Sequence, residues 1–159
     1  MEKFIGKDFQ LNDGTLVSLE EIVEAKIVLL YFSGVWCPPC TITKIVYQYI
    51  GHGFEPVMKN FYKEVNKGCD PKKKNVEVVF VSCDNSEEEY DEHVANMPYP
   101  CIPFDDPRIA DLEEDLDVES IPIVPLLRKN GTIARDSVRQ LIQTQGVKCL
   151  PELLKLSQE

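Results

Sequence analysis

The sequence has no apolar run of about 18 residues, the length that a membrane-spanning helix needs. Its first residues, 1–8, also lack the apolar core of an export signal. Basic residues are scarce, with 17 lysines and arginines against 27 aspartates and glutamates, for a formal charge of −10. Such a chain repels nucleic-acid phosphates and anionic lipid surfaces. We therefore expect no nucleic-acid or membrane partner and a cytoplasmic location, with a nuclear location left open.

The chain also lacks the compositional bias of fibrous or disordered proteins. Hydrophobic residues make up 43% and charged residues 28%, with 8 glycines and 11 prolines. A chain of 159 residues can bury a sizeable core without disulfide or metal staples. No internal repeat and no linker interrupts it. We therefore predict a single domain over residues 1–159.

Two of the six cysteines form a close pair, in the run Trp36-Cys37-Pro38-Pro39-Cys40. Because a reducing cytosol keeps most cysteines as thiols, such a pair is either catalytic or metal-binding. Structural zinc normally takes four ligands, and the sequence offers no second close pair of cysteine or histidine residues. Redox chemistry is thus the favoured interpretation, with no metal and no bound cofactor. A zinc half-site and two incidental buried thiols remain the alternatives.

The hydrophobic pattern predicts an α/β fold. Continuous apolar runs at 27–32 and 76–81 are typical of strands buried on both faces of a sheet. Turn signals at Asn12-Asp13-Gly14 and Asn130-Gly131 predict an N-terminal and a late β-hairpin. Helices are predicted after Ser18 and Ser86, over about 41–50 and 54–65 with a break at residues 51–53 and Pro56, from Pro107 to Leu116, and from Ser137 to Gln145. Together these elements predict a central mixed β-sheet flanked by helices on both faces.

The cysteine pair follows a predicted buried strand directly and precedes a helical pattern. The free N–H groups and dipole of a helix N-terminus favour the thiolate of Cys37, whereas Cys40, one turn further, should be less reactive. Cys37 is therefore predicted to attack a disulfide and Cys40 to resolve the mixed disulfide. Pro38 and Pro39 stiffen the intervening loop, and Trp36 offers a flat apolar surface beside the sulfur.

These residues resemble the tryparedoxins and nucleoredoxins of the thioredoxin superfamily, since the double proline follows Tyr31-Phe32-Ser33 and Trp36. Further matches, which span most of the chain, are Gly53-Phe54-Glu55-Pro56, Phe61-Tyr62, Val79-Phe80-Val81-Ser82, Met97-Pro98-Tyr99, Ile102-Pro103-Phe104 and Val118-Glu119-Ser120-Ile121-Pro122. The resemblance implies a thioredoxin fold with an N-terminal hairpin extension. It also implies that the Ile121-Pro122 bond is cis, faces the cysteine pair and presents backbone groups to a substrate.

The activity that this resemblance implies is protein-disulfide reduction. Its substrates would be disulfide-containing proteins, and an unidentified thiol or reductase would supply electrons. The alternative is a nucleoredoxin-like, redox-sensing module that docks signalling proteins with little turnover. Tyr31 occupies the place of the buried acid of generic thioredoxins, so no carboxylate base is assigned to Cys40.

Two features depart from the family pattern. Residues 41–52 are predicted to be an insertion, because the Gly-Phe-x-Pro motif normally follows the second cysteine almost at once. Its length is close to three helical turns, so it would either lengthen a helix without rotating the downstream apolar face or bulge out as a loop. Arg139 matches one of two tryparedoxin arginines, but Ser137 replaces the other. Recognition of a cationic glutathione conjugate is therefore not predicted.

The remaining cysteines and histidines receive plainer interpretations. Cys83 and Cys149 are predicted to behave as small apolar residues. Cys69 and Cys101 lie in polar or proline-rich segments, where exposure would permit glutathionylation or a regulatory bridge. The two histidines, His52 and His93, are predicted to lie on the surface.

Overall fold

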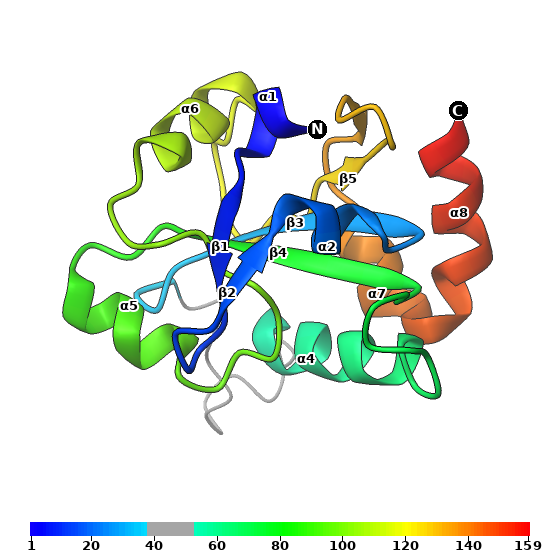
Figure 1. Ribbon diagram of the computed structural model, residues 1–159, viewed down its shortest axis with the longest axis horizontal. Helices are drawn as coiled ribbons and strands as arrows, with labels where there is room; N and C mark the ends of the chain where they lie inside the picture. Colours follow the sequence, from blue (N-terminus) through cyan, green and yellow to red (C-terminus); the bar gives the residue numbers. More distant parts are fainter. Residues whose placement is uncertain (38–52) are drawn as a thin grey trace.

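The computed structural model describes residues 1–37 and 53–159 (Figure 1). Predictions that concern Pro38, Pro39, Cys40, His52 or the helical insertion at 41–52 lie outside the described residues. In chain order the elements are α1 (Glu2–Ile5), β1 (Asp8–Gln10), β2 (Leu16–Ser18), α2 (Leu19–Val23), β3 (Ile27–Ser33), α4 (Phe54–Val65), β4 (Val76–Ser82), α5 (Glu87–Val94), α6 (Pro107–Asp115), β5 (Leu126–Leu127), β6 (Ile133–Arg135), α7 (Arg139–Gln145), a short 3-10 helix (Gly146–Cys149) and α8 (Leu150–Gln158).

A mixed sheet with strand order β4-β3-β5-β6 forms the centre of the molecule. Strands β3 and β4 run parallel, from Ile27 opposite Val76 to Ser33 opposite Ser82, and all their residues are buried. Strands β5 and β6 are antiparallel to their neighbours. Because β3 and β4 are parallel, their carboxyl ends meet at one edge of the sheet, and this edge carries the chain into Trp36 and Cys37.

The predicted N-terminal hairpin is confirmed: β1 and β2 pair antiparallel. It joins the outer side of β4 through Cys101, which bridges both Gln10 and Phe80. The predicted late hairpin is also confirmed, since β5 and β6 pair antiparallel, but β5 covers only Leu126–Leu127. Pro125, which has no N–H, precedes these residues and limits the ladder to β3.

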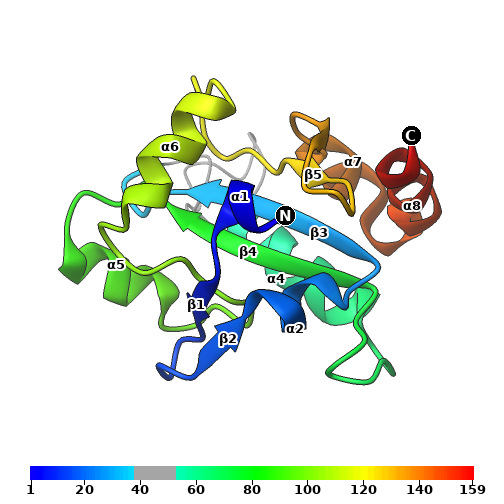
Figure 2. The same cartoon turned by 45° about the horizontal axis from the view of Figure 1, so that its top comes forward.

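Helices cover both faces of the sheet, as predicted. Side chains of β3 and β4 alternate between two hydrophobic clusters. One cluster joins Leu29, Tyr31 and Phe80 to α4, α5, α7 and α8, and the other joins Leu30 and Val81 to α1, α2 and α6. Figure 2 shows α1 and α6 on one side of β3 and β4, with α4 on the other. Within the described part of the chain, no helix is both long and apolar enough to cross a membrane.

Local signals place the helix ends correctly. Ser18 and Glu21 form a capping box at the predicted start of α2, and the Ser86 hydroxyl oxygen accepts from the backbone N–H of Glu89 at the start of α5. The predicted break at Pro56 is wrong, because this proline is the third residue of α4. The first turn of a helix has no intrahelical partner for its N–H groups, so a proline there costs no hydrogen bond.

Candidate active site

Cys37 lies in a tight turn just beyond the end of β3. Its backbone N–H donates to the carbonyl oxygen of Gly34 at 3.1 Å, and its side chain is nearly buried. Glycine at position 34 leaves room for the indole to pack against the turn, because a Cβ there would lie 2.6 Å from Nε1 of Trp36. The helix that the sequence predicts after Cys37 lies outside the described residues.

The Ile121-Pro122 peptide bond is cis, and this distant part of the chain lies beside Cys37. The Sγ atom of Cys37 lies 3.7 Å from the carbonyl oxygen of Ile121. Arg139 at the start of α7 supports this loop, since its Nη1 donates to the carbonyl oxygen of Pro122 at 3.2 Å. The structure thus brings Cys37 and the Ile121-Pro122 step together, as the family resemblance implied.

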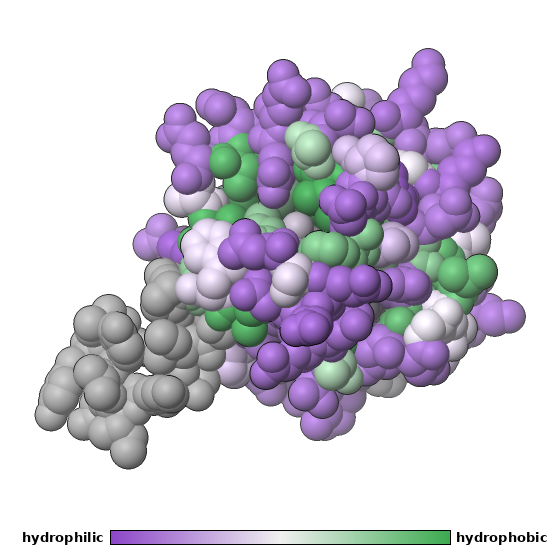
Figure 3. All heavy atoms as spheres, turned by 90° about the vertical axis from the view of Figure 1, so that its left-hand side faces the viewer, coloured by the Kyte–Doolittle hydropathy of each residue, from purple (hydrophilic) through white to green (hydrophobic). Residues whose placement is uncertain are grey.

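Trp36 presents its indole to solvent beside Cys37, with 52% of the residue exposed. The ring is anchored, because Nε1 donates to the carbonyl oxygen of Cys83 at 2.7 Å. It also lines an open groove with Phe104, Ile109 and Glu113. Figure 3, which views the molecule from the side where β3 ends, shows a mostly hydrophilic face with hydrophobic patches between the polar side chains.

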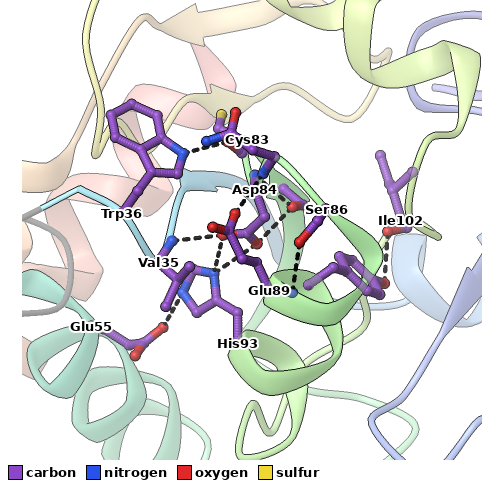
Figure 4. A network of polar contacts seen from close by, with 12 residues as sticks. Val35, Trp36, Glu55, Cys83, Asp84, Ser86, Glu89, His93 and Ile102 are labelled. Carbon is purple, nitrogen blue, oxygen red and sulfur yellow. Dashed lines mark hydrogen bonds and ion pairs between the residues drawn. The ribbon is translucent and has the colours of Figure 1, made fainter.

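Behind the turn lies a buried polar network that the sequence analysis missed (Figure 4). The Asp84 side chain, which is fully buried, accepts from the backbone N–H of Val35 at 2.6 Å and from the hydroxyl of Ser82 at 2.7 Å. Its Oδ2 also lies 2.9 Å from Nδ1 of His93. The other ring nitrogen of His93, Nε2, lies 2.6 Å from Oε1 of Glu55 on α4.

The predicted surface position of His93 is wrong. Only 2% of its side chain is exposed. The spacing of Tyr90, His93 and Val94 could have revealed this burial, because the i, i+3, i+4 pattern puts all three on the inward face of α5. For Asp84 the available signal was its place just after a buried parallel strand.

The protonation state of the network follows from its hydrogen bonds. A neutral imidazole has one donor and one acceptor nitrogen, so two ionised carboxylates at both nitrogens require an imidazolium. Burial alone would lower the pKa of His93, but the hydrogen bonds and charges of Asp84 and Glu55 outweigh burial and raise this pKa to about 9. Burial likewise opposes ionisation of Asp84, yet hydrogen bonds from His93, Val35 and Ser82 hold its pKa below the usual value.

The other described cysteines differ in how far they are buried. Cys149 is buried, as predicted. Cys83 is half-buried, and its thiol donates to Oε1 of Glu113 at 3.4 Å. Burial and the nearby Glu113 charge raise the pKa of Cys83 to about 12. Cys69 is half-buried.

Cys101 does not have the exposure that glutathionylation or a regulatory bridge would require, since only 1% of it is accessible between Gln10 and Phe80. Burial raises the pKa of this thiol from 9.0 to about 12, so its thiolate fraction at pH 8 falls by about three orders of magnitude. We expect iodoacetamide to alkylate Cys101 at least about a hundredfold more slowly in the native than in the unfolded protein. Peptide mass spectrometry with Cys69 as the internal reference measures this, and equal native and unfolded rates would contradict it.

In the described part of the chain, no group of three or more histidine, cysteine, aspartate or glutamate side chains could hold a metal ion. Glu55, Asp84 and His93 do not form such a group because the two carboxylates bind opposite nitrogens of the ring. What the arrangement near Cys37 offers chemically is a sulfur, an adjacent backbone carbonyl and an exposed aromatic face.

Comparisons with known proteins place this geometry in context. The family model described as Thioredoxin-like matches residues 24–133. Tryparedoxin from Trypanosoma brucei brucei is 35% identical over 128 residues, which cover 77% of this chain and 77% of that protein. Probable nucleoredoxin 1 from Arabidopsis thaliana is 31% identical over 140 residues, which cover 88% of this chain but 22% of the longer nucleoredoxin.

Among solved structures, native tryparedoxin I from Crithidia fasciculata superposes with a TM-score of 0.72 at 27% sequence identity, covering 89% of each chain. The thioredoxin fold predicted from the sequence is thereby confirmed. The chain spans only about a fifth of that nucleoredoxin.

Proposed function

Because this chain belongs to the thioredoxin-like family, in the branch of the tryparedoxins and nucleoredoxins, we propose that it reduces protein disulfides through Cys37 and Cys40. The observation that carries the proposal is the approach of the Cys37 Sγ to the Ile121 carbonyl, 3.7 Å apart. The sulfur of Cys37 and the backbone carbonyl of Ile121 would then face the same substrate. The exposed indole of Trp36 provides an apolar surface beside them.

The reaction requires two thiol-disulfide exchanges. The Cys37 thiolate attacks one sulfur of a substrate disulfide, the S–S bond breaks, and the leaving thiolate takes a proton from water. The Cys40 thiolate then attacks the Cys37 sulfur, which releases the second substrate thiol and leaves a Cys37–Cys40 disulfide. Two electrons have moved to the substrate. A dithiol or a thiol-dependent reductase must return them to the cysteine pair.

A Cys40→Ser variant tests this order of events. Without the resolving thiol, the mixed disulfide between Cys37 and the substrate should accumulate. We expect the reduced variant, mixed with a small protein that has an accessible disulfide, such as insulin, to give a covalent adduct on a non-reducing gel that a reducing agent dissolves.

The matched control is the Cys37→Ser variant, which should form no adduct. A redox-sensing docking module gives a different result, because its partner would bind irrespective of either cysteine and without a covalent bond. Failure of the Cys40→Ser variant to trap any disulfide substrate would contradict the proposed chemistry.

A further inference from the structure

The network behind the active-site turn joins four separate segments of the fold. Val35 belongs to the turn that leads to Cys37, Asp84 follows β4, His93 lies on α5 and Glu55 opens α4. None of these side chains takes part in the two exchange steps. Yet the backbone of Val35 is held by Asp84, and Asp84 is held by His93.

The charges around His93 come from three segments. Asp84 and Glu55 contact its two nitrogens, and Lys59 lies 3.9 Å from Glu55. On the preceding turn of α5, Glu89 accepts from the backbone N–H of Asn85. The ring of Phe80 packs edge-on against the imidazole, with centroids 5.0 Å apart. Among the described residues, the buried His93 cation thus lies between the carboxylates of Asp84 and Glu55, and the Asp84 side chain is fully buried.

We propose that protonated His93 is a positioning residue for disulfide exchange: it holds the Asp84 carboxylate in place, and Asp84 holds the turn that carries Trp36 and Cys37. This inference rests on the proposed function of Cys37. His93 does not touch the substrate, and its effect passes through a carboxylate and one backbone hydrogen bond.

Loss of the His93 charge has two consequences for the site. A buried aspartate without its cation is driven to reorient toward water, which releases the Val35 N–H and loosens the turn. The network also becomes more negative by one unit, and a nearby negative charge disfavours the Cys37 thiolate. Both effects should make Cys37 react more slowly at neutral pH.

The first test measures the alkylation of Cys37 by iodoacetamide in the reduced protein, followed by mass spectrometry of the Cys37 peptide from pH 6 to 9. We expect the His93→Gln variant to react about threefold more slowly than the wild type at pH 7, which corresponds to a thiol pKa raised by about half a unit. Equal rates in the two proteins over this range would overturn the proposal.

The second test is independent of how well that variant folds. In an NMR titration of the wild type, the His93 ring and the Val35 amide should report one common transition near pH 9. The Glu55→Gln variant should move both transitions down by about one unit or more, because the ring loses a negative neighbour. The matched control is Glu92→Gln, which removes an exposed charge from α5 and should leave both transitions in place.

If the NMR signal of the Val35 amide did not change as His93 titrates, the proposal would be overturned. Neither measurement requires turnover. A wild type that reduces no disulfide, with the alkylation and titration effects intact, would therefore locate the failure in the proposed function and not in the coupling of His93 to the turn.

Discussion

Replacement of Cys37 by serine is expected to lower the turnover of protein disulfides at least about a thousandfold. A hydroxyl at this position is not ionised at neutral pH and cannot form the mixed disulfide through which exchange proceeds. The assay is NADPH-coupled reduction of a protein disulfide, first with thioredoxin reductase and then with glutathione and glutathione reductase as electron donor. Turnover by the wild type with either donor also identifies the class of reductant that serves the protein.

The Cys69→Ser variant is the matched control for this loss. Cys69 is a half-buried free cysteine in the segment between α4 and β4, so its replacement should leave turnover close to that of the wild type. An active Cys37→Ser variant would contradict the assignment of the nucleophile. If the wild type formed a Cys37–Cys40 disulfide but turned over with neither donor, the redox-sensing docking module would become the better hypothesis.

Replacement of Asp84 by alanine is expected to reduce the free energy of unfolding by about 3 to 5 kcal/mol, the usual cost of breaking a buried ion pair from one side. The change leaves the Val35 N–H and the Ser82 hydroxyl without their acceptor, and it removes one of the two carboxylates that neutralise His93. Equilibrium unfolding in urea measures the loss. Asp91→Ala, at an exposed position on α5, should change stability by no more than about 0.5 kcal/mol.

The same ion pair makes stability depend on pH, with a sign that can be worked out. The pKa of His93 is raised from 6.5 to about 9 in the folded protein, so its contribution is complete below pH 6.5 and is lost as pH rises toward 9. The folded pKa of Asp84 is lowered, so its contribution is lost only in acid, as pH falls through that folded value. The free energy of unfolding of the wild type should therefore fall between pH 6.5 and 9. That of Asp84→Ala should fall much less over the same range. If Asp84→Ala lowered the free energy of unfolding by less than about 1 kcal/mol, the stabilising role of the network would be contradicted.

Local patterns in the sequence predict most of the elements. These patterns are local, because each acts within a few residues and can be recognised without knowing the tertiary structure. They are the apolar runs of β3 and β4, the capping serines Ser18 and Ser86, and the two turns with glycine. The Cys37 and Cys40 pair is equally local. Where local reasoning was wrong, as at Pro56, the error lay in treating the first turn of a helix like its interior.

The arrangement around Cys37 has a different origin. Its neighbour Ile121 is 84 residues away, and Glu55 and His93 are 38 residues apart. No short-range spacing encodes such contacts, and without the family resemblance nothing in the sequence would have marked the Ile121-Pro122 bond as cis.

The sequence by itself thus determined the close cysteine pair, to which we assign the proposed exchange, and most of the helices and strands, because periodicity, capping and turn preferences act between near neighbours. Only the tertiary structure decided that His93 is a buried cation between two carboxylates and that Cys101 is an inaccessible thiol. Burial and charge depend on which distant segments pack together, and the parallel pairing of β3 with β4 brings the turn after β3 beside Asp84, which follows β4.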